Sequence, residues 1–449
     1  MSENHNSGVH LVLGVNDRIP AGKAVVLGLQ HLLAMDLYVM PVVLAELLML
    51  DLSAKSLLIQ MVFFACGLAT LIQTSIGIRL PVVQGASYAP LGALAAIGNG
   101  LGLGAMVGSL IPGAVLLTLI GRPFKVFSSF VKVFVTPIVA GTVIFVIGIA
   151  LMPTALDGIF ACPDGRLVTV QQNAVIGLSS AVLMVAFVLV GLAFEKRFGK
   201  YLRVASVFLA IAGGVAVAAI VRGGVDFSAV GTASWFAFPQ VFPLATPVFD
   251  WGACLVMVFV YFLVLIETTG TWYTVGIVTG EKLTDERLNG GAFGEGLGCL
   301  AGALFGGTPL TGYASNAGVM AITGVASKMA IYAAGGILMV LGLMPKCMSV
   351  LASIPGPVIS GVFGVVAVIV AMNGFRVLKQ VELNEKSMFQ IGIPILLALS
   401  CSFIPKTLLD SLPSVLGCLF SSGVAVGALA SLLLNVLLQG GKKREDHVP

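Results

Sequence analysis

The sequence predicts an all-α polytopic membrane protein, and three observations lead to this fold class. The 449 residues are 58% hydrophobic and only 10% charged, whereas soluble domains carry about 25% charged residues. Four long stretches contain no charge, namely Leu80–Gly121, Gly296–Ser327, Met348–Phe375 and Ser411–Gly441. A bilayer core needs about 20 apolar residues per helix, so each stretch holds one or two spans. Lys and Arg are dispersed between the hydrophobic runs, which excludes a basic nucleic-acid surface.

The hydrophobic runs divide into about fourteen transmembrane spans whose boundaries are uncertain by a few residues. We expect these spans near residues 21–49, 56–78, 80–98, 102–121, 133–153, 173–194, 204–221, 251–277, 292–306, 308–324, 329–346, 352–374, 387–405 and 412–438.

The distribution of Lys and Arg orients the spans. If both termini are cytoplasmic, the inner segments hold 19 of the 24 Lys and Arg residues and the outer segments hold only Lys55, Arg166, Arg222, Lys346 and Lys406. Cytoplasmic loops carry such an excess of positive charge. Residues 1–20 contain no apolar core of a cleaved signal peptide, so we expect the first span to direct the chain to the cytoplasmic (inner or plasma) membrane.

The seven cysteines are interpreted as buried thiols. Their number is odd, their spacing is not paired, and most lie inside apolar runs. This pattern predicts neither a disulfide framework nor a zinc site.

Two spans are expected to be broken helices. Residues 80–92 and 306–318 each begin with Pro and Gly at membrane depth, and both contain Ala-Ser-x-Ala, at 86–89 and 314–317. Non-helical backbone survives in a bilayer only when protein buries it or when it lines a wet cavity. Interrupted spans in corresponding halves indicate a transporter binding site, although re-entrant packing elements would give the same pattern.

Ionisable residues inside spans are costly and therefore mark candidate functional positions. Glu267 lies near mid-membrane, with long uncharged runs on both sides. His31 is the only histidine inside a span and is either a packing or a functional residue. Glu295 is either functional or a favourable charge at a helix start. Asp36 and Glu46, toward the outer end of the first span, are interpreted as structural or gate-lining.

These groups together favour a flat, polar heterocycle as the ligand. A low dielectric favours the neutral form of a carboxyl group, which makes Glu267 a candidate proton carrier and a hydrogen-bond partner. The broken helices would add backbone N–H donors, and Tyr88 would add an aromatic face. A bare inorganic cation would instead require several carboxylates or carbonyls.

Five short motifs occur in order along residues 30 to 324. They are Gln30-His31, Gln84-Gly-Ala-Ser-Tyr88, Glu267-Thr-Thr-Gly270, Glu295-Gly-Leu-Gly298 and the run Asn-Ala-Gly-Val-Met-Ala-Ile-Thr-Gly over residues 316–324. The last run matches the signature Asn-x-Gly-x-x-x-x-Thr followed by Gly, Arg or Lys, with Asn316, Gly318, Thr323 and Gly324 at its fixed positions. The chain thus resembles the nucleobase–ascorbate transporter family, of the xanthine/uracil permease type.

This resemblance implies two inverted seven-span repeats divided into a core domain and a gate domain, with short strands in spans 3 and 10 and a homodimeric assembly. Spans 1–4 and 8–11 would form the core, and spans 5–7 and 12–14 the gate. The corresponding boundaries are an N-terminal cytoplasmic tail (1–20), a first core segment (21–124), a first gate segment (125–250), a second core segment (251–347), a second gate segment (348–438) and a C-terminal cytoplasmic tail (439–449).

The resemblance also implies roles for individual residues. Glu267 would hold a nucleobase on which Tyr88 stacks, and Ala314, Ser315 and Asn316 would complete the substrate site. His31 and Glu295 would support this site or, together with Glu267, couple protons.

Two departures from the family pattern bear on the substrate. Many xanthine-type members have Gln before the signature Asn and uracil-type members have Glu, whereas this chain has Ser315. Members often have Asp or His four residues after the acid of span 8, where this chain has Thr271. The absence of His favours an oxidised purine, xanthine or uric acid, over uracil.

The sequence therefore predicts a proton-coupled nucleobase importer and not an enzyme. No Walker motif is present, so an ion gradient must drive accumulation; H⁺ is expected, and Na⁺ stays open because unwound carbonyls can bind it. A channel or an anion exchanger of related fold would require a basic residue or bare helix N-termini at the site. A membrane-embedded enzyme would require a nucleophile–base pair or metal cluster, for which one intramembrane histidine is insufficient.

Overall fold

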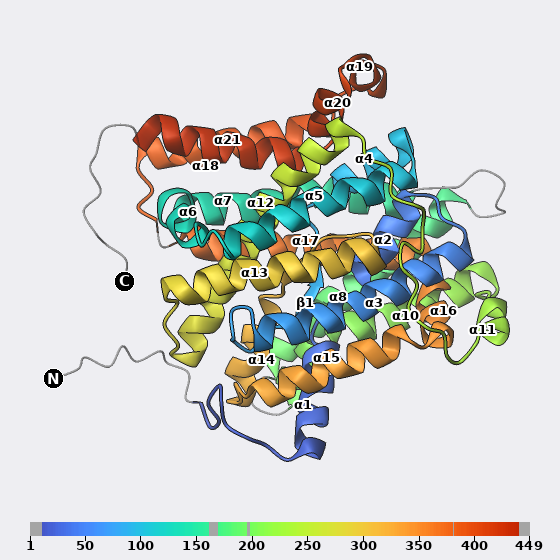
Figure 1. Ribbon diagram of the computed structural model, residues 1–449. Helices are drawn as coiled ribbons and strands as arrows, with labels where there is room; N and C mark the ends of the chain where they lie inside the picture. Colours follow the sequence, from blue (N-terminus) through green and yellow to red (C-terminus); the bar gives the residue numbers. More distant parts are fainter. Residues whose placement is uncertain (1–10, 161–168, 195–197, 380, 440–449) are drawn as a thin grey trace.

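The computed structural model describes residues 11–160, 169–194, 198–379 and 381–439, and most of them are helical (Figure 1). The first ten residues of the predicted N-terminal tail and residues 440–449 of the predicted C-terminal tail lie outside the described residues.

The first half of the chain contains one strand and a series of helices. These are α1 (Ala21–Leu33), α2 (Val39–Leu47), α3 (Leu52–Ser75), β1 (Gln84–Ala86), α4 (Leu91–Leu101), α5 (Leu103–Gly121), α6 (Phe127–Phe134), α7 (Pro137–Phe160), α8 (Val170–Ala193), α9 (Lys200–Val204), α10 (Ser206–Arg222) and α11 (Ser228–Thr232).

The second half of the chain likewise contains one strand and a series of helices. Its elements are α12 (Trp251–Thr279), α13 (Asp285–Ala301), the π-helix η2 (Gly302–Gly306), β2 (Leu310–Gly312), α14 (Ser315–Thr323), α15 (Lys328–Gly342), α16 (Pro345–Ala352), α17 (Gly356–Leu378), α18 (Glu385–Cys401), α19 (Lys406–Ser411), α20 (Ser414–Phe420) and α21 (Gly423–Gln439).

The structure confirms a polytopic helical membrane fold. Among the described residues, six helices are long and apolar enough to cross a membrane unaided: α3, α5, α7, α8, α12 and α17. Every other predicted span coincides with shorter helices, with a bent pair, or with a strand followed by a helix. The span predicted at residues 21–49 is broken, because residues 34–38 separate α1 from α2. The helices α15 and α16 are bent by 83° relative to each other.

Local sequence accounts for several helix ends. Asp51 caps α3 by accepting a hydrogen bond from the Ala54 N–H at 2.7 Å, and Asp250 caps α12 through the Ala253 N–H at 2.8 Å. Short polar side chains at this position satisfy N–H groups that lack a partner in the helix. Gly324 ends α14 with a φ of 69°, a left-handed conformation that glycine adopts without steric cost.

The two strands form one antiparallel pair in the interior. Gln84 pairs with Gly312, Gly85 with Thr311 and Ala86 with Leu310. All six residues are buried. The predicted strands in spans 3 and 10 are therefore confirmed, and each strand lies a few residues before a short helix, α4 or α14.

Small residues allow the principal helices to approach closely. The helix α15 packs on α3, where a Cβ atom at Gly67 would lie 2.6 Å from the carbonyl oxygen of Gly335. The helix α17 packs on α7, where a Cβ atom at Gly148 would lie 2.3 Å from the Ala371 nitrogen. Backbones can come this close only where a side chain is missing.

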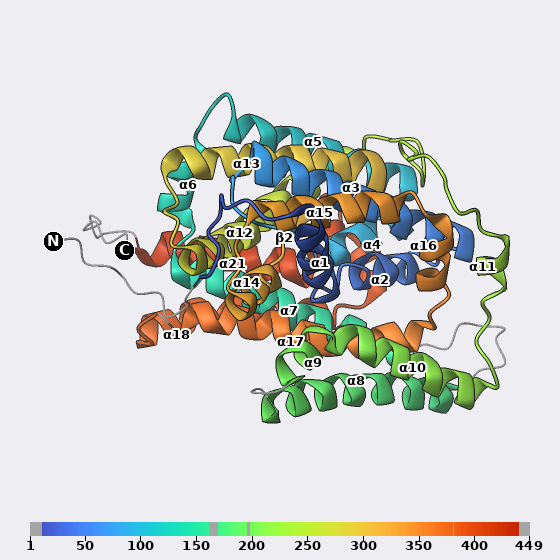
Figure 2. The same cartoon turned by 90° about the horizontal axis from the view of Figure 1, so that it is seen from below.

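The helices α8 and α10 lie together at one edge of the molecule (Figure 2). Large apolar side chains of α8 are exposed there, for example Val182 at 66% and Leu189 at 58%. An exposed apolar surface of this kind faces lipid in a membrane protein.

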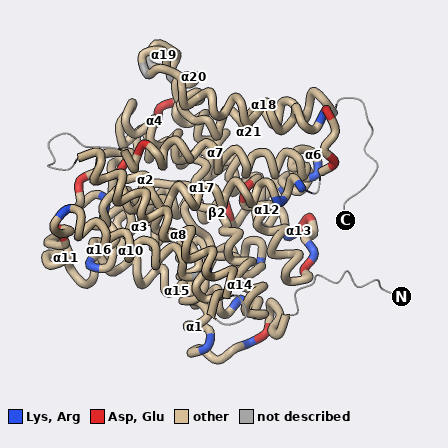
Figure 3. The backbone as a smooth tube through the Cα atoms, turned by 180° about the vertical axis from the view of Figure 1, so that it is seen from behind, with Lys and Arg blue, Asp and Glu red and all other residues tan. Residues whose placement is uncertain are grey.

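Charged residues gather at the two ends of the helices, while the middle carries few (Figure 3). The loops predicted to be cytoplasmic meet at one end, where ion pairs join Arg79 to Glu286 at 4.0 Å and Lys132 to Asp285 at 2.8 Å. Lys55, predicted to be external, pairs with Glu46 at the opposite end of α3 from Arg79. This arrangement agrees with the predicted alternation of loops.

The short helix α6 is fixed to α13 at the same end. The Ser128 N–H donates to Asn289 Oδ1 at 3.0 Å, and Asn289 Nδ2 donates to Ser128 Oγ at 3.1 Å. Together with the Lys132–Asp285 ion pair, these bonds give α6 three polar contacts with α13.

Candidate substrate-binding site

The β1–β2 pair forms the centre of the candidate site, and α12 lies against it. Thr268 Oγ1 accepts a hydrogen bond from the Gly312 N–H at 3.1 Å, and Thr271 Oγ1 donates to the Gly312 carbonyl oxygen at 2.9 Å. Both threonines are buried. The middle of α12 therefore fixes the end of β2.

Glu267 lies beside this pair, as the sequence predicts for a mid-membrane acid. Ser87, which follows β1, donates a hydrogen bond from Oγ to Glu267 Oε2 at 2.8 Å. Glu267 is half-buried. The acid of α12 and the end of β1 thus come together from positions 180 residues apart.

Glu295 projects from α13 toward Gln84 of β1. Its Oε2 accepts hydrogen bonds from Gln73 Nε2 at 2.9 Å and from Gln84 Nε2 at 3.1 Å. The side chain of Thr268 in α12 lies within hydrogen-bonding reach of the same carboxyl group, and Glu295 is only 1% exposed. The carboxyl groups of Glu267 and Glu295 are close enough to interact electrostatically. Glu295 is therefore a member of the buried polar network around the strands and does not cap the start of α13.

His31 of α1 meets the signature residue Asn316 of α14. Both are buried, and their side chains lie within hydrogen-bonding reach of each other. Asn316 Nδ2 also donates to the carbonyl oxygen of Pro81, which fixes the chain just before β1. Asn316 thus links α14 to the first broken segment.

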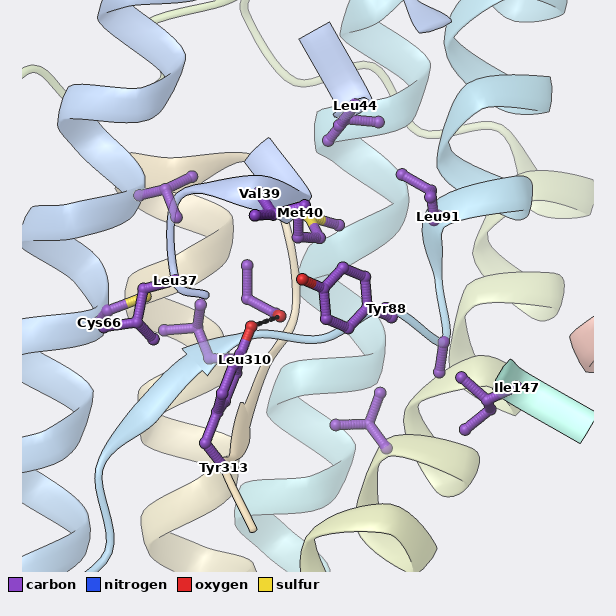
Figure 4. Packing of buried hydrophobic residues seen from close by; sticks show 14 of the residues in the cluster. Leu37, Val39, Met40, Leu44, Cys66, Tyr88, Leu91, Ile147, Leu310 and Tyr313 are labelled. Atoms are coloured by element: carbon purple, nitrogen blue, oxygen red, sulfur yellow. Dashed lines mark hydrogen bonds between the residues drawn. The ribbon is translucent and has the colours of Figure 1, made fainter. Parts of the chain in front are cut away.

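Tyr88 contacts both the break between α1 and α2 and the helix α17. Its hydroxyl donates a hydrogen bond to Asp36, in the break between α1 and α2. Its ring stacks on Phe363 of α17, with a centroid separation of 5.6 Å and an interplanar angle of 28°. Nearby, Tyr313 donates a hydrogen bond to the Ala86 carbonyl oxygen at 2.9 Å, and Figure 4 shows Tyr88 and Tyr313 around this bond.

Ala314 and Ser315 stand at the start of α14, and Ser315 is exposed. Within the described stretches of the chain, their backbone N–H groups donate to no carbonyl. Free N–H groups at a helix start are ready donors for a polar ligand.

The other signature residues shape the end of α14. Gly318 is exposed, and Thr323 Oγ1 donates to the Val319 carbonyl oxygen at 2.9 Å. Gly324 accepts a hydrogen bond from the Val12 N–H at 2.7 Å, which holds the N-terminal segment against this turn.

The sequence analysis does not place three residues at the site that the structure brings there: Asp36, Ser87 and Phe363. The sequence interpretation of Asp36 is structural or gate-lining, and its bond to Tyr88 places it beside the site. Ser87 lies inside one of the five motifs, so a residue-by-residue reading of that motif could have found it. Phe363 lies in an ordinary apolar run, where no local pattern distinguishes it.

No group of three or more His, Cys, Asp or Glu residues that could hold a metal ion occurs among the described residues. The arrangement instead offers hydrogen-bond acceptors, backbone donors and one aromatic ring around the paired strands. These are the elements that recognise a small polar ring.

Membership of a family follows from comparison with known sequences. Residues 22–407 match the family model of the xanthine and uracil permeases, described as a permease family, and the chain belongs to this family. The uric acid permease PucJ of Bacillus subtilis is 33% identical over 431 residues, covering 94% of each chain. The uric acid transporter UacT of Escherichia coli is 30% identical, covering 96% of this chain and 89% of its own. The expected family is confirmed.

Solved structures show a similar fold at low sequence identity. The transmembrane domain of the cyanobacterial bicarbonate transporter BicA has a TM-score of 0.61 at 15% identity, covering 95% of this chain and all of that domain. The murine anion transporter Slc26a9 in its inward-facing state has a TM-score of 0.63 at 15% identity, covering 94% of this chain and 69% of its own.

Proposed function

We propose that the chain is a secondary active transporter that imports a nucleobase, namely an oxidised purine such as xanthine or uric acid, by proton symport. The observation that carries this proposal is the position of Glu267 beside the β1–β2 pair, where it accepts a hydrogen bond from Ser87, the residue that precedes Tyr88. The names of the permease relatives, which include uric acid and xanthine, support the substrate class.

The proposed recognition uses complementary hydrogen bonds. An oxidised purine presents N–H donors and carbonyl acceptors around a flat ring. Glu267 accepts from its N–H groups, and the backbone N–H groups of Ala314 and Ser315 donate to its carbonyls. A site built to bond such groups strongly rejects analogues that lack them, because its buried polar atoms would lose their partners.

The proposed coupling uses the same carboxyl group. Carrying an ionised carboxylate through a low-dielectric interior is costly. A proton bound to Glu267 removes that charge while the substrate-loaded site passes from one side of the membrane to the other. Glu295 and His31, both buried beside the strands, complete the proposed coupling groups.

Alternating access supplies the proposed transport cycle. The core, with α1–α5 and α12–α15, carries the strand pair, and the gate contains α7, α8, α10, α17, α18 and α21. Rigid-body movement of one unit against another is a common mechanism in transporters built of repeats. In this proposal the core moves against the gate and exposes the β1–β2 pair to each side in turn.

Uracil–proton symport is the alternative substrate reading, and anion exchange is a more distant one favoured by the likeness in fold to anion transporters.

One experiment tests these proposals together. Cells expressing the chain would be given labelled xanthine, urate and uracil, with and without a protonophore. Accumulation of xanthine or urate that the protonophore abolishes supports the proposal. Preferential uptake of uracil would identify uracil as the substrate in place of an oxidised purine. No uptake of any of the three compounds would contradict the proposed function.

A further inference from the structure

The stacked pair of Tyr88 and Phe363 joins two segments that the proposed cycle moves apart. Tyr88 lies between β1 and α4, on the side of Glu267, whereas Phe363 belongs to α17, which packs on α7 and α8. Tyr88 is 4% exposed and Phe363 is fully buried. The face of the tyrosine ring is therefore occupied by an aromatic side chain from the opposite unit.

We propose that Tyr88 and Phe363 are the two jaws of an aromatic clamp that holds the ring of the substrate between them. This inference rests on the proposed function and adds Phe363 of α17 as a residue that determines specificity. Asp36 is a positioning residue of the clamp, because its bond to the Tyr88 hydroxyl fixes the ring of that jaw.

The spacing of the rings decides how far the clamp must open. Aromatic planes in contact lie about 3.5 Å apart, so a flat ring between two others requires a separation of about 7 Å. The present centroid separation is 5.6 Å. Because the two rings already contact each other, admitting a base requires an opening of one ring thickness, roughly 3.5 Å.

The position of the clamp fits the hydrogen-bonding groups. Ser87, adjacent to Tyr88 in the chain, donates to Glu267 at 2.8 Å, so the carboxyl group is bonded to the residue that precedes the clamp tyrosine. A base between the rings can present its edge to Glu267 while its faces contact Tyr88 and Phe363. Other aromatic pairs, such as Phe145 with Phe375, join elements away from the strand pair and include no candidate site residue.

Variants at position 363 test the clamp. Phe363→Ala and Phe363→Leu remove the ring, and Phe363→Tyr keeps it. Phe375→Ala, on the same helix, removes an aromatic side chain that pairs with Phe145. For each variant, membrane abundance and the KM and maximal rate of uptake would be measured with whichever of xanthine or urate the wild type transports.

The clamp predicts that Phe363→Ala and Phe363→Leu raise KM roughly 5- to 150-fold with little change in maximal rate, the range expected when one base–aromatic stacking contact is lost. Phe363→Tyr and Phe375→Ala should stay near the wild-type KM. An unchanged or lower KM in Phe363→Ala at normal abundance would overturn the clamp. An equal rise in KM in Phe363→Tyr and Phe363→Ala would overturn the clamp as well.

A binding measurement separates failure of the clamp from failure of the proposed function. If the wild type accumulates no nucleobase, the transport proposal fails. The purified wild type and Phe363→Ala would then be compared by thermal shift with a panel of purines and pyrimidines. A flat heterocycle that stabilises the wild type more than the variant supports the clamp. Equal shifts, or no shift with any compound, contradict it.

Discussion

Thr271 Oγ1 donates a 2.9 Å hydrogen bond to the carbonyl oxygen of Gly312, so a residue of α12 holds the last residue of β2. Family members often have Asp or His at this position, and here a threonine serves the backbone of the strand. The strand pair is therefore fixed from α12, the same helix that provides Glu267.

Thr271→Val should destabilise the protein. The substitution keeps the size of the side chain but leaves the buried Gly312 oxygen without this donor, which costs about 1–3 kcal/mol. We expect a lower melting temperature and a higher KM for uptake. Thr271→Ser retains the hydroxyl and should behave like wild type. Thr274→Val, which removes a hydroxyl bonded within its own helix, is the matched control, and an equal loss of stability in it would contradict the argument.

Glu267→Gln should retain the fold and the membrane level but abolish accumulation. The amide can still accept the hydrogen bond from Ser87, whereas it cannot carry a proton. Uptake against a gradient and membrane abundance would be measured together. Glu286→Gln, at an exposed position of α13, is the control. Normal accumulation by Glu267→Gln would sink the assignment of this acid.

Ser315→Gln should change the ligand preference more than the expression level. Ser315 is exposed at the start of α14, where a longer amide has room. The amide can pair with an edge of the base, so inhibition of uptake by unlabelled xanthine, urate and uracil should be reordered. An unaltered competition profile would show that residue 315 faces away from the substrate.

Accumulation should fall as the outside pH rises, because proton symport needs a proton on the carrier at the outer face. A protonophore should abolish accumulation, and replacing sodium by choline should leave it intact. Uptake of labelled substrate across a pH series measures this dependence. Accumulation that survives the protonophore and disappears in choline would identify sodium as the coupling ion.

Gly67→Ala should lower the thermal stability because a Cβ atom there would lie 2.6 Å from the Gly335 carbonyl oxygen. Overpacking of this kind costs about 1–3 kcal/mol. Gly336→Ala in the facing helix α15 is the control, since nothing lies within 4 Å of a Cβ atom at that position. Size-exclusion chromatography after heating would compare the two variants, and equal melting temperatures would refute the packing argument.

Much of the fold could be predicted because hydropathy and helix breakers act locally. Uncharged runs located the spans, Pro and Gly near residues 80 and 308 located the two broken segments, and the family resemblance implied the strands in them. The break at residues 34–38 was not predicted. The stretch from 21 to 49 is mostly apolar, and it contains no Pro–Gly cluster like those near residues 80 and 308.

The contacts of the site depend on tertiary packing and are less predictable. An intramembrane acid such as Glu267 can be recognised from the sequence, because burying a carboxylate in the membrane costs free energy and such residues are usually functional. Phe363 is one of 26 phenylalanines, and only the approach of α17 to Tyr88 distinguishes it. Asp36 could be identified as unusual from the sequence, but its bond to the Tyr88 hydroxyl depends on the break that precedes α2.

The three polar contacts that attach α6 to α13 determine where the chain can bend. A helix held in this way travels with α13, although it directly precedes α7 in the chain. Only Val135 and Thr136 separate α6 from α7. A displacement of α7 relative to α13 that leaves these contacts intact would be absorbed by the torsion angles of these two residues, which would make them a hinge about ten residues beyond the predicted start of the gate at 125.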